Sequence, residues 1–121
     1  MERVKTIVHQ GRKILYSDFS NLKTIAEVSE VMKEVQKYVN AQPLNSIYSL
    51  INVEGTHFNN AIKDMFAEVA KSNKPFVKVS AIVGITGLKQ IMYRAIMKLT
   101  GRNDKCFSNI EEAKDWLVKQ N

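Results

Sequence analysis

The sequence has few residues of the kinds that form cross-links or metal sites. Among 121 residues there are one cysteine, two histidines, two prolines and one tryptophan. The single cysteine, Cys106, excludes an internal disulfide, and His9 and His57 lie too far from it and from each other in the sequence for a zinc-ligand spacing. We therefore expect neither a disulfide framework nor a bound metal or other cofactor.

Long apolar segments are also missing. The longest mainly apolar run lies near residues 79–88 and is too short to cross a bilayer. Residues 1–5 lack the apolar core of a signal peptide, so we expect a cytoplasmic protein without a transmembrane segment. No repeat, low-complexity tract or linker interrupts the chain, and we treat residues 1–121 as one domain.

The basic residues are concentrated in one part of the chain. The net charge is +6, and residues 71–105 alone carry eight lysines and arginines against one aspartate. Such a patch fits an acidic protein, anionic lipid, nucleic acid or a phosphorylated ligand, or is simply a solvated face. Only Tyr93 lies among these basic residues as a stacking aromatic, so we do not expect nucleic acid to be the partner.

Strand and helix patterns alternate along the sequence. Residues 4–10 and 13–18 are rich in β-branched residues and flank a turn at Gly11, which predicts an antiparallel hairpin. Beyond it, helical periodicity predicts helices after Thr24, near Ile62, from Leu88 and near Ile110. Short apolar runs predict strands over residues 46–53, 76–83 and 105–107.

Local signals predict the helix ends and the buried faces. Thr24 with Glu27 fits a capping box, as does Ser108 with Glu111, and Gly101 ends the helix that begins at Leu88. We expect Cys106 to be a small buried hydrophobe. In the helix from Leu88, we expect the apolar stripe to face the core; it consists of Leu88, Ile91, Met92, Ala95, Ile96 and Leu99.

This order of elements predicts an α/β fold. We expect a mainly parallel central sheet of about five strands, with one antiparallel edge strand from the hairpin and about four helices packed on it. In such sheets, ligands bind at the carboxyl ends of the strands. Three loops should meet there, over residues 18–21, 54–59 and 84–89.

Several short motifs between Gly11 and Val118 also carry a family resemblance. They are residues 11–20, Phe58-Asn59, Asn73-Lys74-Pro75, Val83-Gly84-Ile85-Thr86-Gly87-Leu88, Thr100-Gly101-Arg102 and residues 112–117. Together they resemble the SpoIIAA-like family of small prokaryotic proteins, which share the α/β fold of STAS and CRAL-TRIO domains. The resemblance implies a STAS-like fold. Relatives with this fold hold a nucleotide, lipid or other small molecule, or dock to another protein.

The resemblance does not extend to the phosphorylation switch of the anti-sigma-factor antagonists. In those STAS proteins, a serine in an Asp-Ser-Ser/Thr-Gly motif after the third strand controls docking to a kinase partner. The matching stretch here, residues 59–62, is Asn-Asn-Ala-Ile and offers neither the acid nor the hydroxyl. Thr56 is the nearest substitute for the missing serine.

Two features are candidate binding sites. In residues 84–89, the glycines permit close approach, Thr86 offers a hydroxyl and Lys89 a charge, which would suit an anion at a helix N-terminus. The alternative is a turn that needs glycine only to bend sharply. Arg94, Lys98 and Arg102 recur every four residues and predict a basic ridge, or merely a solvated face. The resulting candidate site consists of Glu54, Thr56, Asn59, Gly84, Thr86, Gly87, Lys89, Arg94 and Lys98.

A catalytic site is the least supported interpretation. Asp18, Ser20 and His57 could meet at the strand ends, but no nucleophile elbow surrounds Ser20, and residues 18–21 fit a turn in which side chains bond their own backbone. We therefore predict that the protein is not an enzyme. Our first hypothesis is a noncatalytic regulatory or protein-interaction module, which could also form a homodimer. The second is a carrier for a small apolar or phosphorylated anionic ligand, in the manner of CRAL-TRIO proteins.

Overall fold

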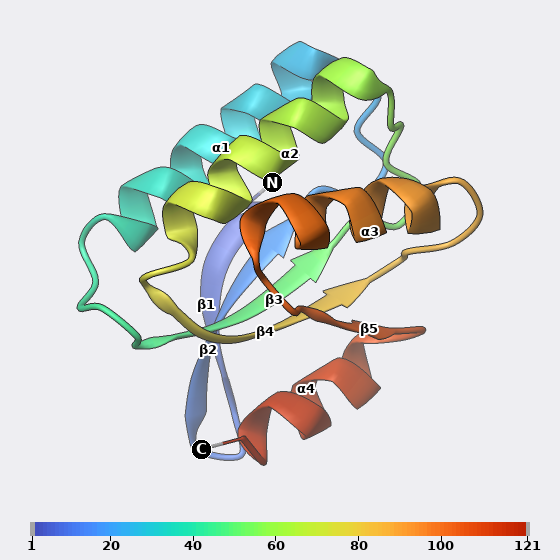
Figure 1. The fold of residues 1–121 in the computed structure, drawn as a ribbon. Helices are drawn as coiled ribbons and strands as arrows, with labels where there is room; N and C mark the ends of the chain where they lie inside the picture. Colours follow the sequence, from blue (N-terminus) through green and yellow to red (C-terminus); the bar gives the residue numbers. More distant parts are fainter. Residues whose placement is uncertain (1, 121) are drawn as a thin grey trace.

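A five-stranded sheet with helices on both faces makes up the structure (Figure 1). The computed structural model describes residues 2–120, so residues 1 and 121 of the expected domain lie outside the described residues. The elements in chain order are β1 (Val4–His9), β2 (Arg12–Asp18), α1 (Ile25–Val39), β3 (Ile47–Asn52), α2 (Asn60–Asn73), β4 (Val77–Val83), α3 (Lys89–Thr100), β5 (Lys105–Phe107) and α4 (Ile110–Val118).

The sheet has the predicted mainly parallel topology. Its strand order is β1-β2-β3-β4-β5, with β1 antiparallel to β2 and every other neighbouring pair parallel. The hairpin turns at Gln10 and Gly11, whose φ angles are 49° and 80°. Positive φ at both central residues is the mark of the tight turn that matches the twist of two antiparallel strands. The α/β prediction and the hairpin are therefore confirmed.

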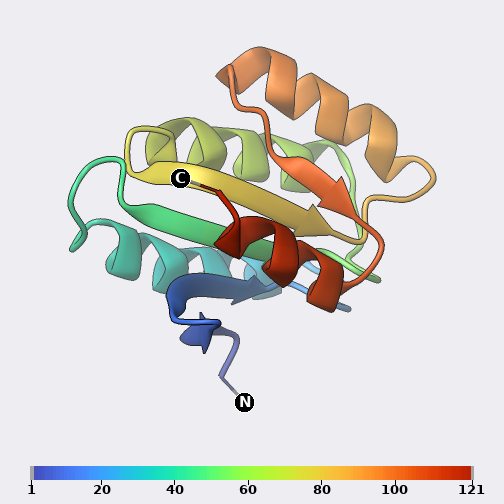
Figure 2. The same ribbon diagram turned by 90° about the horizontal axis from the view of Figure 1, so that it is seen from below.

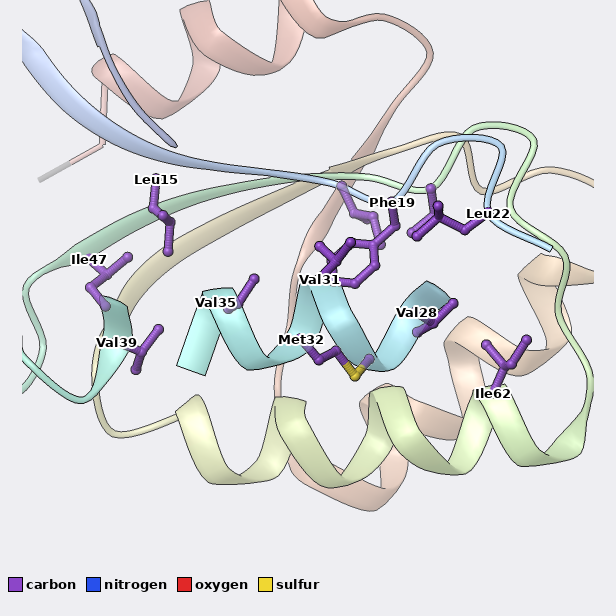
Figure 3. Packing of buried hydrophobic residues seen from close by; sticks show 12 residues of the cluster. Leu15, Phe19, Leu22, Val28, Val31, Met32, Val35, Val39, Ile47 and Ile62 are labelled. Atoms are coloured by element: carbon purple, nitrogen blue, oxygen red, sulfur yellow. The ribbon is translucent and has the colours of Figure 1, made fainter. Parts of the chain in front are cut away.

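Two hydrophobic cores lie on opposite faces of the sheet. Helices α1, α2 and α3 cover one face and α4 covers the other, as the two perpendicular views show (Figures 1 and 2). In the first core, α1 turns its apolar stripe toward β2 and β3, where Leu15 and Ile47 meet it (Figure 3). The apolar period of this helix predicts a buried stripe from Ile25 to Val39; Val28, Val31, Met32, Val35 and Val39 are buried, whereas Ile25 is exposed.

The first capping box is confirmed and the second is wrong. Thr24 Oγ1 accepts a hydrogen bond from the Glu27 amide at 3.2 Å, and Glu27 Oε1 accepts one from the Thr24 amide at 3.1 Å. At α4, Asn109 takes the position expected of Ser108, and its Oδ1 accepts from the amide of Glu112 at 2.8 Å. The helix begins at Ile110, so the residue directly before it is the one that caps it.

Of the stripe predicted for helix α3, Ile96 is buried and most of the other residues are not. Leu88, Ile91 and Leu99 are 78%, 64% and 74% exposed, whereas Ile96 and Thr100 are the buried residues of this helix. The reason is its position, because α3 lies against α2 and extends past the sheet edge formed by β5 (Figure 2). An edge strand of three residues offers too little surface to cover a whole helix face.

Cys106 is exposed, which corrects the expectation that it is buried. It lies in β5, the edge strand over which α3 projects. Partial burial of the sulfur raises the pKa of its thiol. No second cysteine exists in the sequence with which it could form an intrachain disulfide.

Candidate functional site: an apolar cavity beneath two helices

The three expected loops do meet at the carboxyl ends of the strands. The amide of Asn21 donates to the Glu54 carbonyl at 2.9 Å, joining the first loop to the second. Gly84 brings the third loop into contact with the second loop. The approach is so close that a Cβ atom at this position would lie only 2.6 Å from the Glu54 nitrogen. Thr56 and Thr86 thus belong to one rim of the sheet.

At this rim, the first backbone amides of α3 have partners within the protein. The amides of Lys89, Gln90 and Ile91 donate to the carbonyls three residues before them, at 3.1 to 3.2 Å, and are therefore not free for a ligand. The Lys89 ammonium donates to the Val53 carbonyl at 2.7 Å. Burial, and next the charge of Lys23, lowers the pKa of Lys89. These contacts favour the alternative interpretation, a turn that joins strand ends, and the anion site over residues 84–89 stays a prediction.

Two further candidates at the rim have structural contacts as well. The hydroxyl of Thr56 donates to the Phe19 carbonyl at 2.6 Å, and the residue is only 3% exposed. Asn59 caps α2, where its Oδ1 accepts from the Ile62 amide at 2.9 Å. Glu54 and Gly87 are exposed, and Gly87 has φ +58° with nothing within 4 Å of a Cβ atom placed there.

The basic ridge contains two residues rather than three. Arg94 and Lys98 are exposed on α3, next to the exposed apolar residues of the same helix. Gly101 ends the helix with φ 73°, so Arg102 leaves the helical path. Its side chain turns inward and is 7% exposed.

The residues of the catalytic hypothesis do not form a triad. Asp18 Oδ1 accepts from the Ser20 amide at 2.9 Å, the local turn that the sequence predicts. His57 is exposed and is held through its backbone amide, which donates to the Leu22 carbonyl at 2.9 Å. Over residues 2–120, no group of three His, Cys, Asp or Glu side chains is placed to hold a metal ion.

A cavity lies between the sheet and helices α1, α2 and α3, where the carrier hypothesis would place a ligand, although sequence reasoning named none of its lining residues as a site. Its volume is about 80 Å³. The floor is formed by β2, β3 and β4, and the opposite wall by residues such as Phe66 on α2 and Ile96 on α3. Phe66 stacks on Phe58 and meets Phe19 edge to face, with ring centroids 5.2 and 4.9 Å apart. Most of the lining is apolar.

Polar residues also line the cavity, namely Ser17, Ser49, Asn73, Arg102 and Asp104, and we call the part lined by Arg102 and Asp104 its polar end. Arg102 and Asp104 line it there, with 3.1 Å between Nη2 and Oδ1 and each side chain 7% exposed. Arg102 also donates from Nε to Asp104 at 3.2 Å and from Nη1 to the Ala70 carbonyl of α2 at 3.2 Å. The Tyr93 hydroxyl donates to the Asp104 carbonyl, tying α3 to the segment before β5. Burial raises the pKa of Asp104, although Arg102 opposes that rise.

Comparison with solved structures identifies the architecture. The chain is similar to an uncharacterized protein of the DUF3478 family from Shewanella loihica PV-4, whose crystal structure has a SpoIIAA-like fold. The TM-score is 0.72 at 16% sequence identity, over 94% of this chain and 91% of that one. This chain has a SpoIIAA-like fold. Neither a protein-family model nor a curated protein gives a significant match.

The SpoIIAA-like fold places residues 59–62 at the beginning of α2, where Asn59 is the cap. The stretch that matches the switch serine is thus a helix start without a hydroxyl. Thr56, the substitute, points its hydroxyl into the protein. Within residues 2–120, no helix combines the length and the apolarity that crossing a bilayer requires.

Proposed function

We propose that this protein is a noncatalytic binding protein that holds a small apolar molecule between its sheet and helices α1 to α3. The observation that supports this proposal is the cavity of about 80 Å³ with its mainly apolar lining. Protein interiors are normally packed as densely as organic crystals, so a space of this kind is unusual within a core. Apolar cavities of about 150 Å³ accept benzene, so a guest of that size would require this cavity to widen.

The position of the cavity supports a binding role as well. Its wall includes Tyr93, Ile96 and Met97 of α3, the helix that projects past the sheet edge. This helix buries only Ile96 and Thr100. Outward movement of α3 would therefore cost less buried apolar area than movement of α1, which buries a full stripe. A ligand larger than the closed cavity would be accommodated by such a movement.

A cavity-filling variant tests the proposal. Ser49 lies on the cavity floor and is 5% exposed, so Ser49→Leu places a larger apolar side chain inside the space. Ser72→Leu makes the same change at an exposed position of α2 and serves as the matched control. Benzene should raise the melting temperature of the wild type and of Ser72→Leu but not of Ser49→Leu. Equal increases in all three proteins would contradict the proposal, and native mass spectrometry of freshly purified protein would identify a co-purified ligand.

A second candidate function is docking to an acidic protein surface. The observation that favours it is the outward face of α3, where exposed Leu88, Ile91 and Leu99 lie among exposed Arg94 and Lys98. A partner with apolar and acidic side chains would complement this face. A second copy of the chain fits it less well, because two such faces would bring like charges together.

Charge reversal tests the docking function. The wild-type protein is first used to capture an acidic partner protein. The double variant Arg94→Glu with Lys98→Glu should then bind this partner at least about tenfold more weakly than the wild type does. Lys33→Glu with Lys37→Glu reverses two lysines at the same spacing on α1 and should leave binding unchanged. Equal losses in both double variants, or binding of the wild type to anionic vesicles instead of protein, would contradict this function.

A further inference from the structure

The polar end of the cavity provides the chemistry for a ligand head group. Arg102 and Asp104 line both the inner cavity and a separate surface hollow of about 260 Å³ whose other residues include Lys74 and Lys78. The two side chains therefore stand between the apolar interior and the protein surface. A molecule whose tail lies among the aromatic rings would present its other end to this pair.

Two donors at this end lack a well-placed acceptor. Arg102 Nη2 is buried and lies 3.1 Å from Asp104 Oδ1, but its hydrogens do not align with any acceptor. The Ser80 hydroxyl lies close enough to the Asp104 carboxylate to oppose the rise in its pKa, but it too has no acceptor in good hydrogen-bond geometry. Ser80 is 4% exposed and lines the surface hollow rather than the inner cavity; its strand partner across β3 and β4 is Ser49 of the cavity floor. Buried donors are rarely left unused, and a ligand oxygen would satisfy both.

The charges of the pair define which head group fits. Asp104 already neutralises Arg102, and both side chains are 7% exposed. A carboxylate or phosphate entering this end would face the Asp104 charge, and an ammonium would face the Arg102 charge, in each case with little water to screen the repulsion. An uncharged oxygen avoids both costs and still accepts hydrogen bonds.

We propose that the ligand of the cavity is an amphiphile with a single uncharged oxygen-bearing head group, held by Arg102 Nη2 and the Ser80 hydroxyl. Its apolar tail lies between the sheet and helices α1 to α3. This inference rests on the proposed binding function and adds the ligand class to it. A hydroxyl head group would also donate a hydrogen bond to the Asp104 carboxylate.

Four ligands with the same six-carbon tail separate the head-group chemistries: hexane, 1-hexanol, hexanoate and hexylammonium. Wild-type protein should bind 1-hexanol about five-fold more tightly than hexane, and bind hexanoate and hexylammonium more weakly than 1-hexanol. Ser80→Ala should lower the affinity for 1-hexanol about five-fold and leave that for hexane unchanged. This variant is expected to fold, since the Ser80 hydroxyl has no aligned hydrogen-bond partner to lose.

Two further variants complete the test. Ser72→Ala removes an exposed hydroxyl of α2 outside the cavity lining and should not change 1-hexanol binding. Asp104→Asn leaves the guanidinium charge uncompensated and should shift the preference from 1-hexanol to hexanoate. Equal binding of hexane and 1-hexanol with no effect of Ser80→Ala would overturn this inference but leave the binding function standing. Failure of all four ligands to bind the wild type would overturn both.

Discussion

Arg102 and Asp104, two residues apart in sequence, form an ion pair that is almost entirely removed from water, with 3.1 Å between Nη2 and Oδ1. The pair lies between the interior cavity and a hollow on the surface. Arg102 also reaches the end of α2 through the Ala70 carbonyl. One pair of side chains thereby connects the loop before β5 with the helices that form the cavity wall.

The pH dependence of stability should reveal the burial of Asp104. Burial raises its pKa above the ordinary value of 3.8, so the folded protein holds this proton more tightly than the unfolded chain. The resulting stabilisation is complete below 3.8 and is lost as the pH rises through the raised pKa. The groups facing the carboxylate are Arg102 and Ser80, and the Tyr93 hydroxyl donates to the backbone carbonyl of the same residue. Urea unfolding should show the stability of wild type relative to Asp104→Asn falling over this interval, and a rise would contradict the burial described here.

A double-mutant comparison should separate the cost of breaking the pair from its net contribution. Arg102→Met leaves a buried carboxylate without its partner and should lower the free energy of unfolding by roughly 3 to 5 kcal/mol. Arg102→Met combined with Asp104→Leu removes both charges and should recover most of that loss. Chemical denaturation of the three proteins checks this. A double variant as unstable as Arg102→Met alone would show that the ion pair itself stabilises the fold.

Two glycines in the same rim loop should respond differently to alanine. Gly84 has φ +99°, and a Cβ atom there would meet the Glu54 backbone at 2.6 Å, so Gly84→Ala should cost roughly 3 kcal/mol or more. Gly87 has φ +58° and open space around it, so Gly87→Ala should cost only the backbone strain of about 1 kcal/mol. Thermal and urea unfolding give both values. Equal losses of stability in the two variants would contradict the close contact between Gly84 and the Glu54 backbone.

The cap of α4 can be checked in the same way. Asn109→Ala removes the acceptor for the Glu112 amide and should lower stability by about 1 kcal/mol. Ser108→Ala, at the position that the sequence alone suggests, should change it by less than about 0.5 kcal/mol. A larger loss of stability for Ser108→Ala than for Asn109→Ala would support the capping box predicted from Ser108 and Glu111.

Most of the fold follows from local patterns in the sequence. The Thr24 capping box marks the start of α1, and the Gln10-Gly11 turn sets the hairpin. The alternation of strands and helices is enough to predict a mainly parallel sheet. These features depend on neighbouring residues, so they can be found without knowing the tertiary structure.

The parts that depend on packing between distant elements could not be predicted. The apolar period of α3 defines a stripe but not what lies opposite it, and the edge position of α3 leaves Leu88 and Leu99 exposed. The spacing of Arg102 from Lys98 suggests a third ridge residue, yet Gly101 turns its side chain inward. The cavity itself leaves no signal, because its lining residues have the same composition as a filled core.

Methionine methyl NMR tests the central claim most directly, because the chain contains its own controls. Met32 and Met97 line the cavity, whereas Met65 and Met92 lie on α2 and α3 outside its lining. Titration with 1-hexanol should shift the methyl signals of Met32 and Met97 and leave those of Met65 and Met92 nearly unchanged. Shifts confined to Met65 and Met92, or no saturable shift at any of the four, would contradict binding between the sheet and helices α1 to α3.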